Sequence, residues 1–443
     1  MPLSPDDARA TLSRRTNALL GILIAAGFGL TLFVFYPGVM TYDAKFVYED
    51  IAKGVLGDWQ SPAMTVLWSL IDPIAPGPGS MLLFIVTAYW LAFGLLTFSV
   101  AQRSIGLAVA LPLLALSPPA FVFVGIIWRD VLFSTMWILA AALAFAAVDL
   151  KPRLRITLQA LALLLFARGV LLRPNALIAA PILGAYIVWP AQMSWKRLAI
   201  IYLPAVAGLF GLVQLIYYGA LGATRQHPLH SIMVFDLGGI SHFAKQNQFP
   251  VTWTDAETAL LTDGCYHPTE WDLYWRFEPC QFVMHRLEGD RLFGTRSIVD
   301  AWAGAIVHHP IAYLKHRCAF MWNFLTGANL TMWTSDLDDP SKLPLAGRPA
   351  FAALVTIHNA LKLTPLFRAG TWLLLCIAVC GFAWRQRDTP SGAFAIGICG
   401  SAAVYVATFF AVGVASDFRY AYLAVLAGIT GAIVTASKRR ALT

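Results

Sequence analysis

The chain has 443 residues, of which 58% are hydrophobic and 13% are charged, and its mean hydropathy is +0.66. Soluble globular proteins carry about 25% charged residues, so this composition excludes a soluble enzyme, a disordered protein and a small secreted disulfide-rich domain. The net charge of +8 needs no nucleic-acid partner to explain it, because the positions of the basic residues fit a membrane topology. The sequence therefore predicts an all-α polytopic membrane protein.

The apolar segments are the main signal along the chain, and a helix needs about 20 apolar residues to cross a bilayer. The first segment, 17–36, follows Arg14 and Arg15 and runs into Pro37-Gly38, so we expect a retained span and not a cleaved signal peptide. Further spans are expected at 79–101, 105–125, 131–148, 156–172, 175–192, 198–220, 366–384, 391–413 and 421–437. These make about ten spans, within a range of roughly 9 to 13.

The basic residues give this arrangement an orientation. With the N-terminus in the cytoplasm, the loops that carry Lys and Arg fall inside, as the positive-inside rule requires. We therefore expect both termini in the cytoplasm. The residues that support this orientation are Arg103, Lys151, Arg153, Arg155, Lys196, Arg197, Arg385, Arg387, Lys438, Arg439 and Arg440.

The first transmembrane module, residues 1–221, contains a long outer loop at 38–78. Two juxtamembrane helices are expected in this loop, at 41–56 and 61–74. The first of them mixes charged and apolar residues, as an amphipathic helix at a membrane surface does. We therefore expect the outer loop to lie against the outer face of the membrane.

A second outer segment, residues 222–365, is polar enough to form an extracytoplasmic, mostly helical domain, and 366–443 holds the last transmembrane helices. An oxidising compartment outside the cytoplasm permits a disulfide between Cys265 and Cys280. A zinc site formed by these cysteines and His267 would lack a standard ligand spacing. We expect the disulfide and no metal site here.

Charged and polar side chains collect at the outer ends of the predicted spans. Such groups are costly to bury beside a membrane and are the first candidates for a functional site. Because they come from four turns on one side of the membrane, with one arginine about a turn inside the fifth span, we expect a single site. The candidates are Asp43, Arg129, Asp130, Arg168, Arg173, Asn175, Asp417, Arg419 and Tyr420.

Structural explanations exist for several of these residues. Asp43 could cap the helix at 41–56, as Asp does well, and Arg173 could extend its guanidinium to the lipid headgroups. The carboxylate–arginine pairs of the other two turns could be structural ion pairs. Arg168 is the hardest to explain in this way, because a buried guanidinium needs a carboxylate or phosphate partner.

All nine histidines of the chain lie between His227 and His358. None of them combines with Asp or Glu at a recognised metal-ligand spacing, so we expect no metal site among them. His230 and His242 lie at the start of the outer domain. There they could face the layer of charged residues and contact a substrate.

Taken in order, these motifs resemble those of the GT-C superfamily of integral-membrane glycosyltransferases, which take sugars from polyprenyl-phosphate carriers. The resemblance rests on a first span ending in an acidic loop, two juxtamembrane helices, and the turns at 128–130, 172–175 and 417–420. The stretch between Ala301 and Arg317 also looks like segments of bacterial members. None of the motifs is specific alone, and their order and common side carry the resemblance.

Two features depart from the family pattern. Relatives such as protein mannosyltransferases and aminoarabinose transferases tend to carry an Asp-Glu pair in the first loop, whereas Asp43 is followed here by Ala44. Only a short segment follows the last predicted span, where such relatives often have a large soluble domain. These departures bear on the choice of base and on the acceptor.

The resemblance implies an enzyme that moves a sugar from a polyprenyl-phosphate donor to a hydroxyl of a lipid, glycan or protein acceptor, with inversion at the anomeric carbon. It implies a bacterial inner membrane, with the active site facing the periplasm and membrane lipids around it. Asp43 would be the catalytic base. It leaves a divalent metal open, since some relatives need one. Donor phosphate would contact Arg129, Arg173, Arg419 and Arg168, and sugar or supporting contacts would come from Asp130, Asn175, Asp417, Tyr420, His230 and His242.

The main alternative is a transporter or flippase of a lipid-linked glycan. Transporters tend to place ionisable groups near the membrane midplane and to use broken helices in repeated halves, whereas here the charges lie at the outer ends and no repeat stands out. An acyl or phosphate transferase would need a Ser-His-Asp or metal-phosphatase arrangement, which the sequence does not show. A nucleotide-binding glycine motif is also missing, as expected for a donor that arrives through the bilayer.

Overall fold

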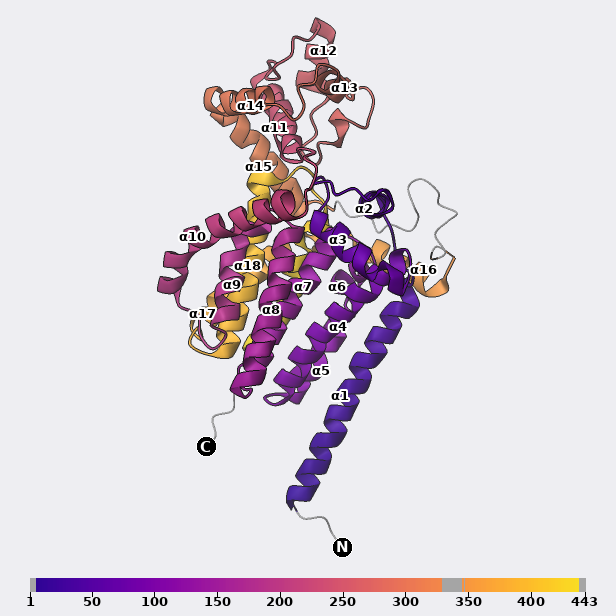
Figure 1. Ribbon diagram of the computed structural model, residues 1–443, viewed down its shortest axis with the longest axis vertical. Helices are drawn as coiled ribbons and strands as arrows, with labels where there is room; N and C mark the ends of the chain where they lie inside the picture. Colours follow the sequence, from indigo (N-terminus) through magenta and orange to yellow (C-terminus); the bar gives the residue numbers. More distant parts are fainter. Residues whose placement is uncertain (1–4, 329–344, 346, 438–443) are drawn as a thin grey trace.

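The computed structural model describes residues 5–328, 345 and 347–437, and within them the chain forms helices and loops with isolated bridges but no β-strand. The all-α prediction is confirmed. Figure 1 shows a bundle of long helices with a smaller helical domain standing on one end. The basic residues Lys438, Arg439 and Arg440 lie outside the described residues.

Seven of the described helices are long and apolar enough to cross a membrane. The number becomes eight if α5 (Ile105–Ala115) and α6 (Pro118–Val124), which meet at an angle of 50°, form one broken span. The chain is therefore a polytopic membrane protein. The seven are α1 (Pro5–Phe35), α4 (Pro78–Ala101), α7 (Arg129–Ala147), α8 (Pro152–Leu172), α10 (Trp195–Gln214) continued by the π-helical η2 (Leu215–Ala220), α18 (Pro390–Val412), and α19 (Tyr422–Ala436) with the preceding turn η7 (Phe418–Ala421).

The expected number of ten spans is not supported. The segment expected at 175–192 forms only α9 (Ala176–Val188), and the segment expected at 366–384 forms only α17 (Ala369–Trp384). Both are shorter than the roughly 20 residues that a bilayer requires. One physical reason is visible at the end of α9, where Trp189 precedes Pro190, because a residue before proline disfavours the helical conformation. The span expected from hydropathy at 175–192 included these two residues, and it was therefore longer than the helix that forms.

The segment 38–78 contains two helices, α2 (Tyr42–Lys53) and α3 (Pro62–Ile71), where helices were expected at 41–56 and 61–74. Gly54 ends α2 with a φ of +66°, a left-handed conformation that glycine adopts without strain. The Ser61 hydroxyl accepts a hydrogen bond from the N–H of Met64 at the start of α3, where Pro62 is pre-organised for the first turn. These local signals explain why the helices begin and end near the predicted positions.

Helix α7 lies at the centre of the bundle. Its membrane-length window is 94% buried, and it packs against α4, α8, α18 and α19. By contrast, only 6% of the corresponding window of α10 is buried, so α10 is peripheral and exposes an apolar surface. The first residues of α7, Arg129 and Asp130, thus emerge at the middle of one end of the bundle.

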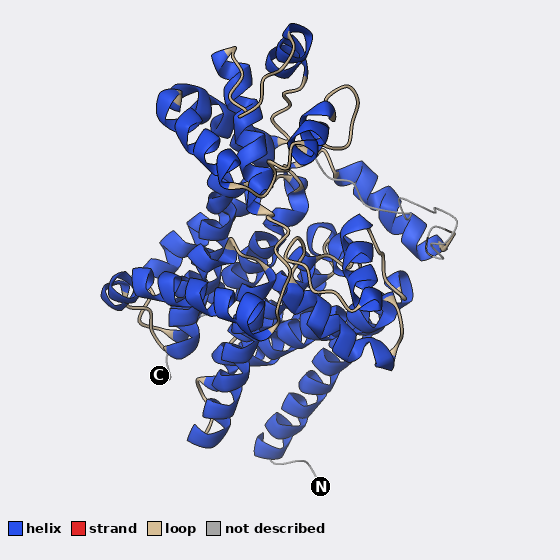
Figure 2. Cartoon of the chain, turned by 45° about the horizontal axis from the view of Figure 1, so that its top comes forward, coloured by secondary structure: helices blue, strands red, loops and turns tan. Residues whose placement is uncertain are grey.

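Above that end stands the outer domain, formed by five described α-helices and their loops (Figures 1 and 2). Helix α15 joins it to the bundle, because it packs against α11 and α14 and also against α17 and α18. Helix α16 (Pro349–Leu361), although expected within 222–365, packs against α1 and α6 instead. The five are α11 (Leu229–Ala244), α12 (Asp255–Ala259), α13 (Phe282–Gly289), α14 (Arg296–His308) and α15 (Pro310–Thr326).

Candidate functional site

Asp43 lies in the first turn of α2, and its carboxylate binds Arg419. The Nη1 atom of Arg419 lies 2.8 Å from Oδ2 of Asp43, and Nε2 of Gln60 donates to Oδ1 at 3.2 Å. The N-cap of α2 is Thr41, whose hydroxyl accepts a hydrogen bond from Nε1 of Trp128 at 2.8 Å. The capping explanation for Asp43 is therefore wrong, since its carboxylate points toward the last span and not to its own helix end.

Arg419 connects Asp43 to a second carboxylate. Its Nε atom lies 3.3 Å from Oδ2 of Asp417, and Oδ1 of Asp417 accepts the backbone N–H of Arg419 at 2.9 Å. The guanidinium carbon lies 4.7 Å from the ring centre of Trp128, and Nη2 donates to the Tyr420 hydroxyl at 3.2 Å. One guanidinium is thus fixed by two carboxylates and an aromatic face, an arrangement that suits Arg and not Lys.

Arg173 and Asp130 form a second, more deeply buried ion pair, in which the side chains are 11% and 6% exposed. Arg173 therefore does not reach out to lipid headgroups, and the partner of Asp130 is not its neighbour Arg129. The guanidinium carbon of Arg173 lies 5.1 Å from the ring centre of Tyr420, and that of Arg419 lies at the same distance. Tyr420 therefore links the two arginine–carboxylate pairs.

Arg129 and Asn175 lie at the edge of this arrangement. The Nη1 atom of Arg129 is 3.5 Å from the carbonyl oxygen of Trp59, and Nδ2 of Asn175 is 3.5 Å from the hydroxyl of Thr408 on α18. Arg129 forms no ion pair with any residue in the described ranges, so its charge is the one most open to an anion. We call the following set the charged cluster: Asp43, Arg129, Asp130, Arg173, Asn175, Asp417, Arg419 and Tyr420.

The two carboxylates bound to Arg419 differ in their electrostatics. Burial favours the neutral form of Asp43, but the charges of Arg419 and then Arg129 outweigh it and lower the pKa of Asp43 below its ordinary value. For Asp417, burial dominates and raises the pKa, although Arg419 opposes the shift. A pair of nearby carboxyl groups whose pKa values are pushed apart is suited to separate roles. Asp43 is the one kept ionised.

The outer domain also reaches the charged cluster, through the loop around Trp271 and not through His230 or His242. The N–H of Trp271 donates to Val414 at 2.9 Å, and the N–H of Ser416 donates to Thr269 at 2.6 Å, so this loop pairs with the segment leading into Asp417. Burial raises the pKa of Asp272, and the charge of Asp43 adds to that effect. The domain therefore adds a carboxylate near Asp43.

Aromatic side chains extend from this contact. The ring centres of Trp59 and Trp271 lie 6.0 Å apart, and those of Trp271 and Trp275 lie 6.1 Å apart. Trp59 comes from the first outer loop and the other two from the outer domain. The sequence shows that these segments are rich in Trp, but it does not show which Trp side chains contact one another.

Three of the predicted site residues do not join the charged cluster. Arg168 is half-buried in α8 and forms no ion pair with a described residue, so the partner expected for it is not found there. His230 accepts the N–H of Gly294 at 3.1 Å, and His242 bonds the carbonyl of Thr262 at 2.7 Å. Both histidines thus make their contacts inside the outer domain.

A second buried network lies inside the outer domain. Nη2 of Arg317 lies 2.7 Å from Oδ1 of Asp236, Nε2 of His316 lies 3.2 Å from the same oxygen, and Nε1 of Trp302 donates to Oδ2 at 2.7 Å. Nη1 of Arg317 also donates to the carbonyl of Gly413 at 2.7 Å. The network therefore holds the start of the segment that carries Asp417 and Arg419.

A disulfide joins Cys265 and Cys280, whose Cα atoms are 5.5 Å apart. No group of three or more His, Cys, Asp or Glu side chains is placed to hold a metal ion in the described part of the chain. Asp43 and Asp130 are each bound to an arginine. Within the described ranges, these two carboxylates are therefore not placed to hold a divalent cation.

The charged cluster contains three carboxyl groups, of which Asp43 has a lowered pKa, and three guanidinium groups, with aromatic side chains beside them, at one end of the helix bundle. Such a layer can bind an anion and accept a proton from a neighbouring hydroxyl. Comparison of the chain with protein-family models, curated proteins and solved structures finds no match, so the geometry and chemistry of the charged cluster are the basis for a functional assignment.

Proposed function

We propose that this protein is a membrane glycosyltransferase that moves a sugar from a polyprenyl-phosphate carrier to a hydroxyl acceptor. The observation that supports the proposal most directly is the 2.8 Å contact between Arg419 and Asp43. It puts a carboxylate that can accept a proton beside a guanidinium that can bind phosphate, at the ends of helices that a lipid-linked donor can approach within the bilayer.

In this proposal Asp43 is the general base. It accepts the proton of the acceptor hydroxyl as that oxygen attacks the anomeric carbon from the face opposite the phosphate, so the configuration inverts. A carboxylate with a lowered pKa is a weak base. Donor phosphate competes with Asp43 for Arg419, which loosens the contact and raises the pKa of Asp43 when the donor is bound.

The arginines stabilise the leaving group. Negative charge grows on the polyprenyl phosphate as the bond from the anomeric carbon to the phosphate oxygen breaks, and fixed guanidinium groups bind that charge most strongly at this stage. Arg129 has no carboxylate partner among the described residues and makes the first contact. Arg173 and Arg419 follow, oriented by Asp130 and Asp417.

The orientation in the membrane belongs to the same proposal. Arg103, Lys196 and Arg387 lie at the end of the bundle opposite the charged cluster, as cytoplasmic residues do under the positive-inside rule. Both termini are then cytoplasmic. The charged cluster and the outer domain face the periplasm of a bacterial inner membrane, where polyprenyl-phosphate sugars and hydroxyl acceptors of the cell envelope meet.

The test is release of polyprenyl phosphate by purified protein from a panel of polyprenyl-phosphate sugars, offered with lipid and glycan acceptors. Asp43→Asn should lower the rate about 10²- to 10⁴-fold with unchanged melting temperature. Asp50→Asn, the same substitution in the same helix but outside the charged cluster, should keep the wild-type rate. Wild-type turnover by Asp43→Asn would reject the base assignment. Binding and translocation of the carriers without cleavage would favour the transporter.

A further inference from the structure

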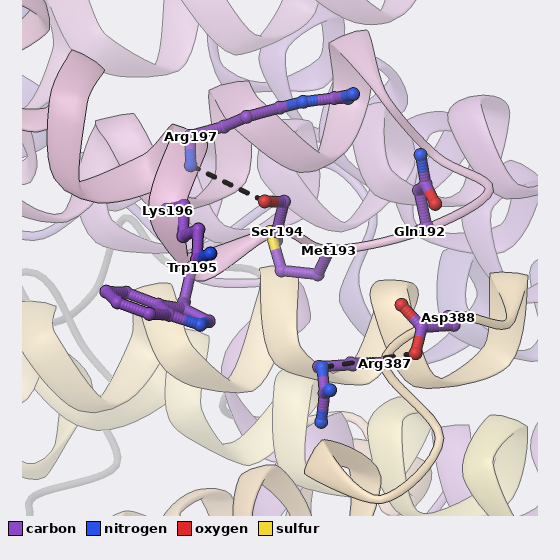
Figure 3. A pocket seen from close by; sticks show the side chains of 8 residues that line it. All are labelled: Gln192, Met193, Ser194, Trp195, Lys196, Arg197, Arg387 and Asp388. Atoms are coloured by element: carbon purple, nitrogen blue, oxygen red, sulfur yellow. Dashed lines mark hydrogen bonds and ion pairs between the residues drawn. The ribbon is translucent and has the colours of Figure 1, made fainter.

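At the end of the bundle opposite the charged cluster, two loops far apart in the sequence form a basic hollow (Figure 3). Its volume is about 280 Å³. The backbone N–H of Met193 donates to the carbonyl of Arg387 at 2.8 Å, which ties the α9–α10 loop to the α17–α18 loop. We define the basic hollow by the residues that matter to its chemistry: Ser194, Trp195, Lys196, Arg197, Arg387 and Asp388.

The side chains of the basic hollow favour an anion. Three of them are cationic, whereas Asp388 is the one carboxylate of the set. Its Oδ2 lies 4.0 Å from Nε of Arg387 in an exposed setting, too loose to neutralise that arginine. Lys196 and Arg197 form no ion pair with any described residue. Figure 3 shows Arg197 and Arg387 on opposite sides of Ser194, with Asp388 beside Arg387.

The start of α10 adds to this charge. The first backbone N–H groups of a helix have no acceptor within the helix and carry partial positive charge. The Ser194 hydroxyl is 3.5 Å from the N–H of Arg197. This hydrogen bond is long, so it only weakly satisfies the free N–H groups at the start of α10. The N-terminus of a 20-residue helix and three cationic residues thus line one hollow.

Three tryptophans lie around the basic hollow. Trp189, Trp195 and Trp384 are partly exposed at the ends of α9, α10 and α17, and Trp prefers the membrane–water interface. The guanidinium carbons of Arg197 and Arg387 lie 5.5 and 5.7 Å from the ring centres of Trp189 and Trp384, respectively. A Trp ring beside each guanidinium is the pairing expected of residues at the level of the lipid phosphate groups.

We propose that the basic hollow binds the headgroup of an anionic phospholipid from the leaflet that it faces. A soluble phosphate would meet the same charges, but Ile200 and Leu203 are 75% and 74% exposed on α10 beyond the headgroup level. This apolar surface can receive acyl chains, which a soluble phosphate lacks. The proposal does not depend on the glycosyltransferase assignment, since the basic hollow is at the other end of the bundle.

The test compares two triple variants of the full-length protein with the same loss of charge. Lys196→Gln/Arg197→Gln/Arg387→Gln removes the charges of the basic hollow. Lys151→Gln/Arg153→Gln/Arg155→Gln removes three exposed charges at the start of α8, at the same end of the bundle but outside the basic hollow. Binding is measured by native mass spectrometry and by quenching of tryptophan fluorescence with brominated phosphatidylglycerol.

Wild type and the α8 variant should bind phosphatidylglycerol in preference to phosphatidylcholine, and the basic-hollow variant should bind it about 100-fold more weakly. Equal losses in the two variants would mean a general surface-charge effect and would overturn the site. Displacement of the lipid by glycerol phosphate at comparable concentration would overturn the choice of a lipid. If the triple variant fails to fold, Arg387→Gln alone should reduce phosphatidylglycerol binding by a smaller factor. Unchanged binding by Arg387→Gln would reject the site.

Discussion

Arg419 binds Asp43 at 2.8 Å although 376 positions separate the two residues in the chain. The contact joins the start of the last described span to the first outer loop. Asp43 lies on a 12-residue helix, and Arg419 follows a segment that Arg317 and the loop around Trp271 hold by hydrogen bonds. The geometry of the charged cluster therefore depends on the outer domain as well as on the bundle.

The pH dependence of sugar transfer should report this contact. Asp43 must be ionised to act as a base, and Arg419 helps to hold its pKa below the ordinary value of 3.8. Arg419→Gln should raise that pKa and move the acid limb of the kcat/KM profile to higher pH, whereas Arg419→Lys, which keeps the charge, should move it less. Identical acid limbs in the wild type and both variants would contradict this electrostatic role.

Two arginines near each other in the sequence should respond differently to the same substitution. Arg173→Lys should lower the turnover number about 10²- to 10³-fold, because Lys lacks the planar pair of donors that binds Asp130 and a phosphate together. Arg168→Lys should stay near wild type, because Arg168 is outside the charged cluster. Steady-state kinetics of purified protein checks both. Equal activities of the two variants would argue against a role of Arg173 in binding phosphate.

The outer domain should lose stability in mildly acidic solution. Burial lowers the pKa of His316 below its ordinary value of 6.5, and the charge of Arg317 acts in the same direction, although Asp236 opposes it. The unfolded chain therefore binds a proton more readily than the folded one, and stability is lost as the pH falls below about 6.5. Melting temperatures measured across this range should drop toward acid.

His316→Gln should flatten this dependence, and His285→Gln, at an exposed position on α13, should leave it unchanged. His230, whose pKa burial also lowers, accounts for a remainder of the same sign. A melting profile in which His316→Gln keeps the full acid loss would assign the effect to other groups.

The disulfide should contribute measurably to the stability of the outer domain. In the chain-entropy model a crosslink that closes a loop of about 15 residues stabilises by roughly 3 kcal/mol. Cys265→Ala/Cys280→Ala should therefore lower the melting temperature, whereas Cys318→Ala, which removes a free exposed cysteine, should not. Gel mobility of the wild type should change with reductant. Unchanged mobility would show that the crosslink is not formed in the purified protein.

The sequence by itself determined the class of the molecule. Long apolar runs require helices that satisfy their own backbone groups in a bilayer, and the sequence also predicted two short helices in the first outer loop, at 41–56 and 61–74, which the structure shortens to α2 (Tyr42–Lys53) and α3 (Pro62–Ile71). It also identified the turns that contribute Asp43, Arg173 and Arg419, because polar groups next to membrane spans are costly and stand out.

Only the tertiary structure decided which of these groups meet. The sequence suggested Arg129 as a partner for Asp130, yet helix packing brings Arg173 to it, and it leaves Arg168 outside the charged cluster. The number of membrane-length helices likewise depends on where packing and residues such as Pro190 end a helix. Hydropathy and spacing are local properties, whereas the partner of a charged side chain is set by how distant helices pack, which no short stretch of sequence encodes.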